Sequence, residues 1–252
     1  MLALFLLIPT GPVLAFALPA AATGRAVEII DGDTVRLASG REVRLVGIQA
    51  PKLPLGRRGF AEWPLAGEAK AKLESLAAGH TLTLHHGGAA QDRHGRLLAH
   101  LTRDGGAVWL QGEMLRAGLA RVYSFPDNRA LVAEMLTLER EARQARRGIW
   151  GDRYYRIRKP EETGRDIETF QIVEGRVLKA AATKERSYLN FGEDFRSDFT
   201  VSIARRDLKL FGRGYDPVSL EGETIRVRGW LKSVNGPMIE ATHPEQIEVL
   251  RP

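Results

Sequence analysis

Short alternations of apolar and polar residues run through the chain after residue 25, and they predict β-strands joined by tight turns. In one such segment, Val43 and Leu45 fall on one face of a strand, while Arg44 and Val46 fall on the other. The turns between these segments are rich in Gly, Asp and Ser. Strands of this kind are expected in the first half of the chain at 26–30, 34–37, 42–48, 81–85 and 97–101.

Three segments of the first half have helical periodicity instead. Leu65–Ala78 is rich in Ala, Lys, Glu and Leu, and Leu110–Ala117 is shorter; a glycine follows each of them. The third, Asn128–Arg147, is amphipathic and also ends at a glycine. Short strands with separate helices predict an α+β fold, in which a small barrel has helices packed on its outside.

The second half of the chain returns to strands. The charged, proline-containing stretch Arg153–Arg165 predicts a linker. Beyond it, we expect a short polar helix near Arg205–Phe211 and strands at 170–177, 188–191, 199–203, 224–230 and 247–250. This spacing predicts a second, small OB-like β-barrel. The expected domains are therefore 25–152 and 169–252, joined by a linker at 153–168.

The first 24 residues contain no charged side chain and include the apolar run Leu2–Ile8. Small residues follow at Ala20–Ala22, so this segment resembles a secretory signal peptide, with cleavage after Ala17 or Ala22. An uncleaved membrane tether is the alternative; prolines and a glycine within the segment make a spanning helix less favourable. We therefore expect a periplasmic or extracellular protein.

Composition narrows the possible partners. The chain has 37 basic and 31 acidic residues, a formal charge of +6, which suits an anionic partner such as nucleic acid. It has no cysteine, which excludes disulfides and cysteine-ligated metal sites. Its hydrophobic content of 44% is typical of a globular protein with a core.

Three polar clusters interrupt the strands of the first half. They are Asp31-Gly32-Asp33-Thr34, then Arg44 followed by Gln49-Ala50-Pro51-Lys52, and Asp92-Arg93-His94-Gly95-Arg96. Their order resembles the staphylococcal nuclease (thermonuclease) family, whose blocks read Asp-Gly-Asp-Thr, Arg followed by Asp-Thr-Pro-Glu, and Asp-x-x-Gly-Arg. The resemblance spans about half the chain, from Ala26 to Trp150.

This resemblance implies a phosphodiester hydrolase that acts on nucleic acid with the help of calcium. It assigns Arg44 and Arg96 to the phosphate, since planar guanidinium groups can bind phosphate through two hydrogen bonds. It assigns calcium to Asp33, to the position of Gln49 and to the backbone carbonyl of Ala50. Asp31 fits a structural role in the turn.

Two positions depart from the family pattern. The Asp and Glu of Asp-Thr-Pro-Glu are Gln49 and Lys52 here. The formal charge of the three acidic family positions changes from −3 to 0, because Asp33 contributes −1 and Lys52 contributes +1. At about 4 Å and an effective dielectric constant of about 20, two unit charges interact with an energy of roughly 4 kcal/mol. That is enough to remove useful calcium affinity.

The orientation of Lys52 decides between the remaining interpretations. If Lys52 points inward, it replaces the metal as a fixed cation, and the site binds phosphate without hydrolysis; acting as a base with a lowered pKa is a further option. If it points outward, a loop carboxylate such as Glu62 or Glu68 completes a metal site and the nuclease activity survives. In a third interpretation, the chain is a cell-envelope protein-interaction module in which the two arginines have no role.

Other candidate residues have alternatives of their own. The resemblance places Tyr123 against the nucleotide, but an ordinary surface or core tyrosine is equally consistent with the sequence. Arg93 and His94 border the expected phosphate site and are otherwise exposed loop residues. His85 and His86 are adjacent on a strand and point to opposite faces, so we expect no shared metal ion. In the second half, each member of an aromatic set is either a core residue or a stacking platform: Tyr188, Phe191 and Trp230.

Overall fold

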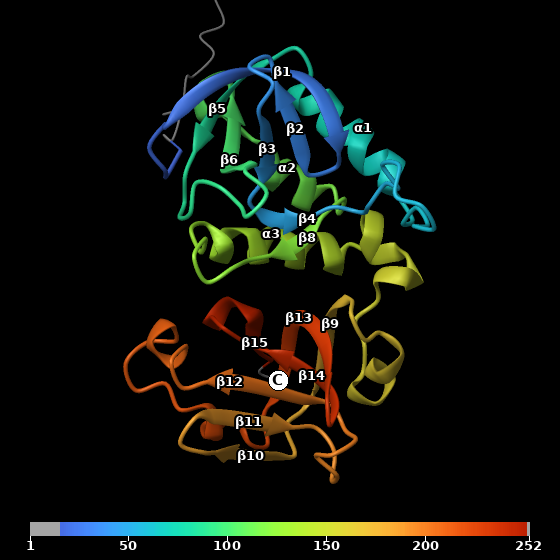
Figure 1. Ribbon diagram of the computed structural model, residues 1–252, viewed down its shortest axis with the longest axis vertical. Helices are drawn as coiled ribbons and strands as arrows, with labels where there is room; N and C mark the ends of the chain where they lie inside the picture. The colour runs from blue at the N-terminus through green and yellow to red at the C-terminus, as the bar shows by residue number, and fades with distance from the viewer. Residues whose placement is uncertain (1–15, 251–252) are drawn as a thin grey trace, which may run out of the picture.

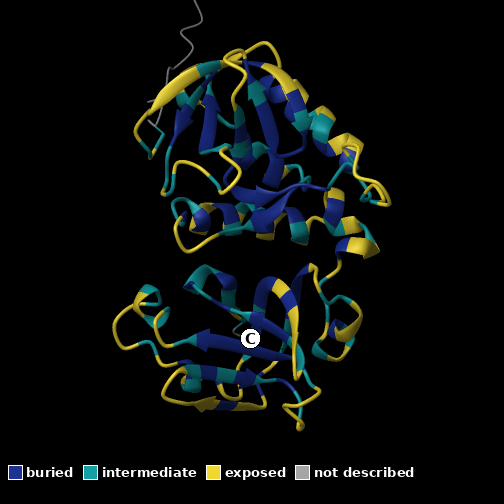
Figure 2. Cartoon of the chain, in the orientation of Figure 1, coloured by how far each residue is buried: buried dark blue, intermediate teal, exposed yellow. Residues whose placement is uncertain are grey.

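The computed structural model describes residues 16–250, which form two lobes stacked along the long axis of the molecule (Figure 1). Each lobe has its own hydrophobic core (Figure 2). The α+β class expected from the sequence is confirmed. Within the described part of the chain, no helix has both the length and the hydropathy needed to cross a bilayer.

The first lobe is built on a closed five-stranded barrel. Successive strands β1, β2 and β3 pair antiparallel, β3 pairs parallel with β6, and β5 closes the ring between β6 and β1. The short strand β7 extends the sheet beyond β6. The strands are β1 (Ala22–Asp31), β2 (Thr34–Leu37), β3 (Glu42–Leu45), β5 (Thr81–His85), β6 (Leu97–Arg103) and β7 (Val108–Trp109).

A two-stranded ribbon and the third of three helices lie at the end of the first lobe that faces the second lobe, whereas the first helix lies along the side of the barrel (Figure 1). The ribbon consists of β4 (Gly47–Gln49) and β8 (Arg121–Tyr123). The helices are α1 (Ala66–Ala77), α2 (Leu110–Arg116) and α3 (Val132–Gln144). Helix α3 is shorter than the expected Asn128–Arg147, because Leu131 adopts a left-handed conformation (φ 60°) immediately before it. Helix α1 buries Ala69, Leu73 and Leu76, which share one face through their three- and four-residue spacing.

The N-terminal segment overlaps the barrel. Residues 1–15 of the expected signal segment, 1–24, lie outside the described residues. Within the rest of the segment, Ala22 is the first residue of β1 and pairs with Leu84 of β5. The ring of His85 contacts the backbone carbonyl of Leu18 at 2.9 Å. Of the two expected cleavage positions, only the one after Ala17 keeps this contact and the whole of β1. Export itself stays a prediction.

The stretch expected to be a linker is folded against both lobes. It contains two 3-10 helices, Arg153–Tyr155 and Pro160–Arg165. Tyr155 is buried, and its hydroxyl donates to the carbonyl of Pro64 in the first lobe at 2.6 Å. Side-chain burial thus fixes the path of this stretch between the two lobes.

The second lobe is a seven-stranded sheet that curls into a half-barrel. Its strands are β9 (Phe170–Arg176), β10 (Lys179–Ala182), β11 (Arg186–Asn190), β12 (Thr200–Ala204), β13 (Thr224–Val234), β14 (Gly236–Glu240) and β15 (Ile247–Val249). The long strand β13 pairs with β9, β14 and β15, and so lies in the interior of the sheet. Strands β10 and β14 were not expected, and the expected helix near Arg205–Phe211 is a single 3-10 turn, Leu208–Leu210.

Ion pairs hold the two lobes together. Arg228 of β13 is 1% exposed, and its guanidinium lies 2.9 Å from the carboxylate of Glu139 in α3 and 2.7 Å from that of Glu248. Nearby, Arg129 pairs with Glu245 at 2.8 Å across the same interface. These contacts fix the second lobe against the ribbon of β4 and β8, so its side chains can take part in a site on the first lobe.

Candidate phosphate site

The first polar cluster forms a tight turn between β1 and β2. The backbone N–H of Asp33 donates to the carboxylate of Asp31 at 3.0 Å, which confirms the turn role expected for Asp31. A Cβ atom on Gly32 would lie 2.7 Å from the Cβ atoms of both Ala50 and Ala69, so only glycine fits there. The turn is therefore pressed against α1 and against the segment that leads to Lys52, and both aspartates are buried.

Lys52 points inward and binds both buried carboxylates. Its Nζ atom lies 2.7 Å from each carboxylate oxygen of Asp33 and 3.0 Å from Oδ2 of Asp31. The outward orientation is therefore wrong for this protein. Glu62 and Glu68, which that alternative required, are both exposed on the surface.

The two carboxylates respond differently to this environment. Complete burial raises the pKa of Asp33, and the neighbouring Arg44 and Lys52 only partly oppose that effect. For Asp31, burial acts in the same direction, but Lys52, the hydrogen bond from Asp33 and Arg44 together hold the pKa well below its usual range. Asp31 is therefore the member of the pair that is firmly ionised opposite the ammonium group.

Arg44 is held at the edge of this cluster by β3. Its guanidinium lies 3.0 Å from the carboxylate of Asp33 and donates to the carbonyls of Asp33, Leu45 and Ile48 at 3.1, 3.0 and 2.8 Å. These bonds set its orientation, and only 12% of the side chain is exposed. Arg44 thus presents a small, fixed part of its guanidinium to solvent.

Arg96 closes the third polar cluster. Its Nε atom donates to Asp92 at 2.8 Å, and its backbone N–H donates to the same carboxylate at 3.0 Å. Gly95, with φ of 79°, makes the turn that brings the two residues together. A third of the Arg96 side chain stays exposed. The loop therefore offers a positioned but accessible guanidinium.

A cavity of about 600 Å³ brings the two arginines together, as the sequence motifs predict. Residues 45–48 also line it, as do Arg93 and His94. Tyr123 of β8 lies in the same cavity, and its hydroxyl accepts a hydrogen bond of 2.7 Å from the indole N–H of Trp230 in β13. The cavity therefore has one wall from the second lobe. Of the aromatic side chains that line it, Phe125 was not among the expected site residues, and Trp230 was expected only as one of two alternatives.

Comparison with known proteins finds relatives of the first lobe. Residues 42–152 match the model of the family described as staphylococcal nuclease homologue. A protein named "Uncharacterized endonuclease" from Escherichia coli O157:H7 is 33% identical over 132 residues, which are 51% of this chain and 77% of that protein. Protein ParB of Escherichia coli is 33% identical over 146 residues, 51% of this chain and 72% of ParB. An uncharacterized protein of Bacillus anthracis is 30% identical over 137 residues, 50% of this chain and 60% of that protein. The chain belongs to the staphylococcal nuclease homologue family.

This family typically uses calcium, and the residues of this member do not fit that ion. Oδ1 of Asp33 lies 2.7 Å from Lys52 Nζ and 3.0 Å from Arg44, and Oδ2 accepts hydrogen bonds from Lys52 and from the backbone N–H of Ala50. An ammonium group thus stands against the oxygens that a cation would need. Among residues 16–250, no three His, Cys, Asp or Glu side chains cluster as a metal site would require.

Gln49 does not join this cluster, contrary to the expectation that it could offer an oxygen to a metal. Its Oε1 accepts two hydrogen bonds from Arg121, at 2.9 and 2.7 Å. Arg121 in turn donates to the carbonyl of Phe170, the first residue of β9 in the second lobe, at 3.0 Å. Burial lowers the pKa of Arg121 to about 10, so it remains charged at neutral pH. In this member of the family, the Gln49 position connects the two lobes.

The histidine pair behaves as its position on a strand predicts. His85 bonds to Thr102 and to the carbonyl of Leu18, while His86 bonds to the carbonyl of Leu98. The two rings face different neighbours, so they share no ligand position.

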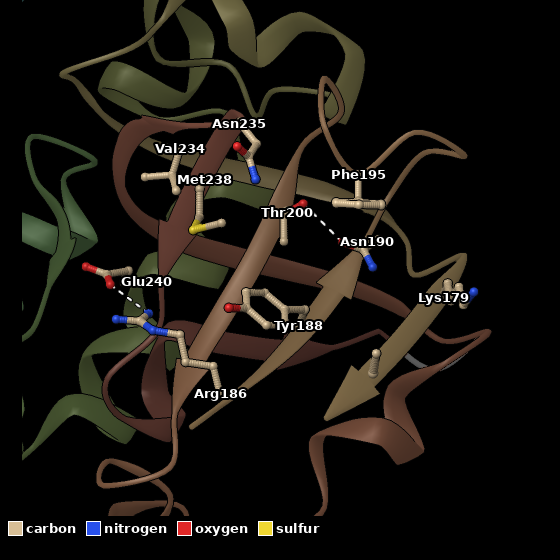
Figure 3. Close-up of a pocket in the computed structure, with 11 residues that line it drawn as sticks. Lys179, Arg186, Tyr188, Asn190, Phe195, Thr200, Val234, Asn235, Met238 and Glu240 are labelled. Carbon is tan, nitrogen blue, oxygen red and sulfur yellow. Dashed lines mark hydrogen bonds and ion pairs between the residues drawn. The ribbon is translucent and has the colours of Figure 1, made fainter. Parts of the chain in front are cut away.

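The second lobe has a larger cavity, of about 680 Å³, on the outer face of β10, β11, β12 and β14 (Figure 3). Tyr188, Phe195 and Met238 contribute to its largely apolar lining, and the ion pair between Arg186 and Glu240 lies at one end.

The two lobes also differ in charge. Residues 25–152 include 19 basic and 15 acidic side chains, whereas residues 169–250 include 12 of each. Of these two segments, the one that contains Arg44 and Arg96 therefore carries the excess positive charge.

Proposed function

We propose that this protein binds nucleic-acid phosphodiesters in the cavity of Arg44 and Arg96, and that Lys52 replaces calcium as a permanent cation in the adjoining cluster of Asp31 and Asp33. The observation that carries the proposal is the triple contact of the Lys52 ammonium with Asp31 and Asp33. In this arrangement the phosphate grip of the family persists without the metal, so the proposal does not include calcium-dependent hydrolysis.

Local charge supports binding of an anion over binding of a cation. Arg44 and Lys52 together offset the two buried carboxylates, and Asp92 offsets Arg96. Arg93 adds a further positive charge at the cavity, and it has no carboxylate partner among the described residues. A phosphate that enters the cavity can accept hydrogen bonds from guanidinium N–H groups in place of solvent. The planar guanidinium group suits the phosphate because it can donate two parallel hydrogen bonds.

The chemistry of the site also supports binding without hydrolysis. Hydrolysis of a phosphodiester needs a group that orients or deprotonates the attacking water. The ammonium of Lys52 donates to two carboxylates and has no lone pair free to accept a proton. Asp92 lines the cavity, but its hydrogen bonds to Arg96 and to the backbone of His94 lower its pKa, although partial burial opposes the shift. A carboxylate with a lowered pKa is a weak base.

A binding experiment tests the phosphate grip, by which we mean the binding of a phosphate by Arg44 and Arg96. The variant with Arg44→Ala and Arg96→Ala is compared with a matched variant, Arg41→Ala and Arg58→Ala, which removes the same charge at two exposed positions. We expect the first variant to lose at least about tenfold in affinity for a labelled oligonucleotide, and its salt dependence to fall by roughly two phosphate contacts. The matched variant should stay close to the unmodified protein. Equal losses in both variants would contradict a specific grip and leave only general charge attraction.

A cleavage experiment tests the role of Lys52. Purified protein is incubated with single- and double-stranded substrates in calcium and in chelator. We expect intact substrate in both conditions. Calcium-dependent cleavage that the chelator abolishes, and that Arg96→Ala also abolishes, would overturn the proposal in favour of a working nuclease.

The apolar, uncharged first 24 residues support a further part of the proposal, namely that binding takes place outside the cytoplasm. Fractionation of the producing cells checks this. Recovery of the protein in the cytoplasmic fraction alone would contradict export and would leave the binding proposal intact.

A further inference from the structure

Three aromatic side chains gather beside the phosphate grip. Tyr123 and Phe125 come from the first lobe and Trp230 from the second, and all three line the cavity of Arg44 and Arg96. Phe125 is 44% exposed and Trp230 is 46% exposed. The rings of Tyr123 and Phe125 meet edge to face, with centroids 4.7 Å apart. Large aromatic surfaces left open to solvent in a cavity mark a place where a ligand can cover them.

The position of Trp230 is fixed from two directions. Its indole N–H donates to the Tyr123 hydroxyl at 2.7 Å, and Tyr123 pairs with Gly47, three residues after Arg44. On its own strand, Trp230 lies two residues after Arg228, so both side chains emerge on the face of β13 that is turned toward the first lobe. The buried ion pair of Arg228 with Glu139 therefore also positions the indole ring at the cavity.

We propose that Trp230, together with Tyr123 and Phe125, forms a platform on which an unpaired base stacks while Arg44 and Arg96 hold the adjacent phosphate. The ligand class is then single-stranded nucleic acid. This inference rests on the proposed phosphate binding and adds to it a residue outside the family segment 42–152. The second lobe thereby completes the binding site of the first.

The chemistry of stacking explains the preference for single strands. In a duplex, both faces of each base are covered by its neighbours, so an aromatic side chain can reach a base face only in an unpaired strand. Every base has such a face, so little sequence preference is expected. The guanidinium groups bind the backbone of either kind of strand, and the aromatic platform supplies the difference between them.

The test separates the phosphate grip from the platform by using two short oligonucleotides of equal length. One is a thymidine oligomer, and the other has the same backbone with abasic sites throughout. We expect the unmodified protein to bind the thymidine oligomer about tenfold more tightly, since stacking of one base changes affinity by about that factor. Trp230→Ala should remove this advantage and leave binding to the abasic oligomer unchanged. Trp230→Phe, which keeps an aromatic face but loses the bond to Tyr123, should retain most of it.

Phe195→Ala is the matched control, because Phe195 is a 54% exposed aromatic residue in the other large cavity (Figure 3). We expect it to bind both oligomers like the unmodified protein. Equal affinity of the unmodified protein for the two oligomers, with no effect of Trp230→Ala, would overturn the platform and leave the phosphate grip in place. Loss of the advantage in Phe195→Ala instead would move the base site to the second cavity. Failure of the unmodified protein to bind either oligomer would contradict the proposed function itself.

Discussion

Lys52 brings its positive charge into a space enclosed by two buried carboxylates and a guanidinium. The sequence predicts that the formal charges of Asp33, Gln49 and Lys52 sum to zero, because this sum depends only on residue identities. It does not predict the inward orientation, which follows from the packing of Gly32 against Ala50 and from the turn that aims Asp31 at the ammonium. The two substitutions in the family motif thus have different consequences, since Lys52 enters the cluster while Gln49 turns away to Arg121.

Reversing the charge of Lys52 should restore a site for calcium. In Lys52→Glu, three carboxylates face one another, and we expect the free energy of unfolding to fall by roughly 3–5 kcal/mol in chelator. Calcium should then stabilise this variant, by about 3 kcal/mol at a hundredfold excess over its dissociation constant. Thermal unfolding with and without calcium measures both effects.

The control for this prediction is Lys52→Met, which removes the ammonium without adding a ligand. We expect it to lose stability and to show no response to calcium, like the unmodified protein. A Lys52→Glu variant whose melting temperature ignores calcium would mean that these carboxylates cannot converge on an ion. Gln49→Asp should not help, because its carboxylate would face Arg121.

At the scale of elements, the turn from β3 into β4 carries the chain from Arg44 toward the interface with the second lobe. Gly47 makes that turn with φ of 84°, and a Cβ atom there would lie 2.5 Å from the terminal methyl carbon of Met135 in α3. The residue therefore has two reasons to be glycine, a left-handed backbone and a close approach to the end of the Met135 side chain.

Gly47→Ala should therefore cost more than backbone strain alone. Gly40 has almost the same conformation, with φ of 81°, but open space around it, so Gly40→Ala measures the backbone cost by itself. We expect Gly40→Ala to lose about 1 kcal/mol of unfolding free energy and Gly47→Ala to lose about 2 kcal/mol, because the end of the Met135 side chain has to move as well. Urea denaturation gives both values. Equal losses would show that α3 yields to the extra methyl group without cost.

The elements that the sequence predicts well are those whose signal is local. The alternation around Val43 and Leu45 gives β3, and glycine after an apolar helical pattern gives the end of α1. The elements it misses depend on distant partners. Residues Lys179–Ala182 have no β-branched side chains, and they form β10 only because β11 pairs with them. Gly236 and Pro237 argue against a strand, yet β14 lies between β12 and β13 and bonds to both.

At the scale of the whole molecule, the site depends on an interface that the sequence does not reveal. The pattern around Arg228 is that of an ordinary strand with an arginine at an outward position. Its carboxylate partner, Glu139, lies 89 residues earlier in the chain. The position of Trp230 is equally hard to predict from the sequence, because Trp230 lies beside Tyr123 only when the lobes are docked. The phosphate-binding arginines could be predicted from motifs, whereas the aromatic platform could not.

Stability should fall in mild acid because two histidines are buried in neutral form. Burial lowers the pKa of His243, which bonds to Ser124 across the lobe interface, to about 4, and it lowers the pKa of His100 to about 4 as well. The unfolded chain binds these protons near the ordinary value of 6.5, so stability is complete above that pH and is lost as the pH falls toward 4. The loss is up to about 3 kcal/mol for each histidine.

Urea denaturation across this pH range measures the effect, with His243→Gln as the variant and His94→Gln as its control. His94 is exposed, so its substitution should leave the pH dependence unchanged. His243→Gln should make the dependence shallower by about half. An unchanged slope in His243→Gln would mean that the interface histidine accepts its proton at no cost.

The buried pair of Arg228 and Glu139 should decide whether the two lobes unfold together. Both side chains are almost completely buried, so removal of one leaves the other charged without its main partner. We expect Arg228→Met to lose about 3–5 kcal/mol and to separate unfolding into two transitions, because Glu139 also accepts the backbone N–H of Val122 beside the interface. Adding Glu139→Gln to Arg228→Met should recover part of that loss, since it removes the buried charge of Glu139, which would otherwise keep only the longer ion pair with Arg143 at 3.2 Å. Lys232→Met is the control, because Lys232 is on the same strand but pairs with Glu240 in solvent, and its loss should stay within about 1 kcal/mol.

Calorimetry with hydrogen exchange in each lobe measures these outcomes. A single transition in Arg228→Met, with a loss no larger than in Lys232→Met, would show that the lobes cohere without this pair, and Trp230 would then owe its position at the cavity to its bond with Tyr123 alone.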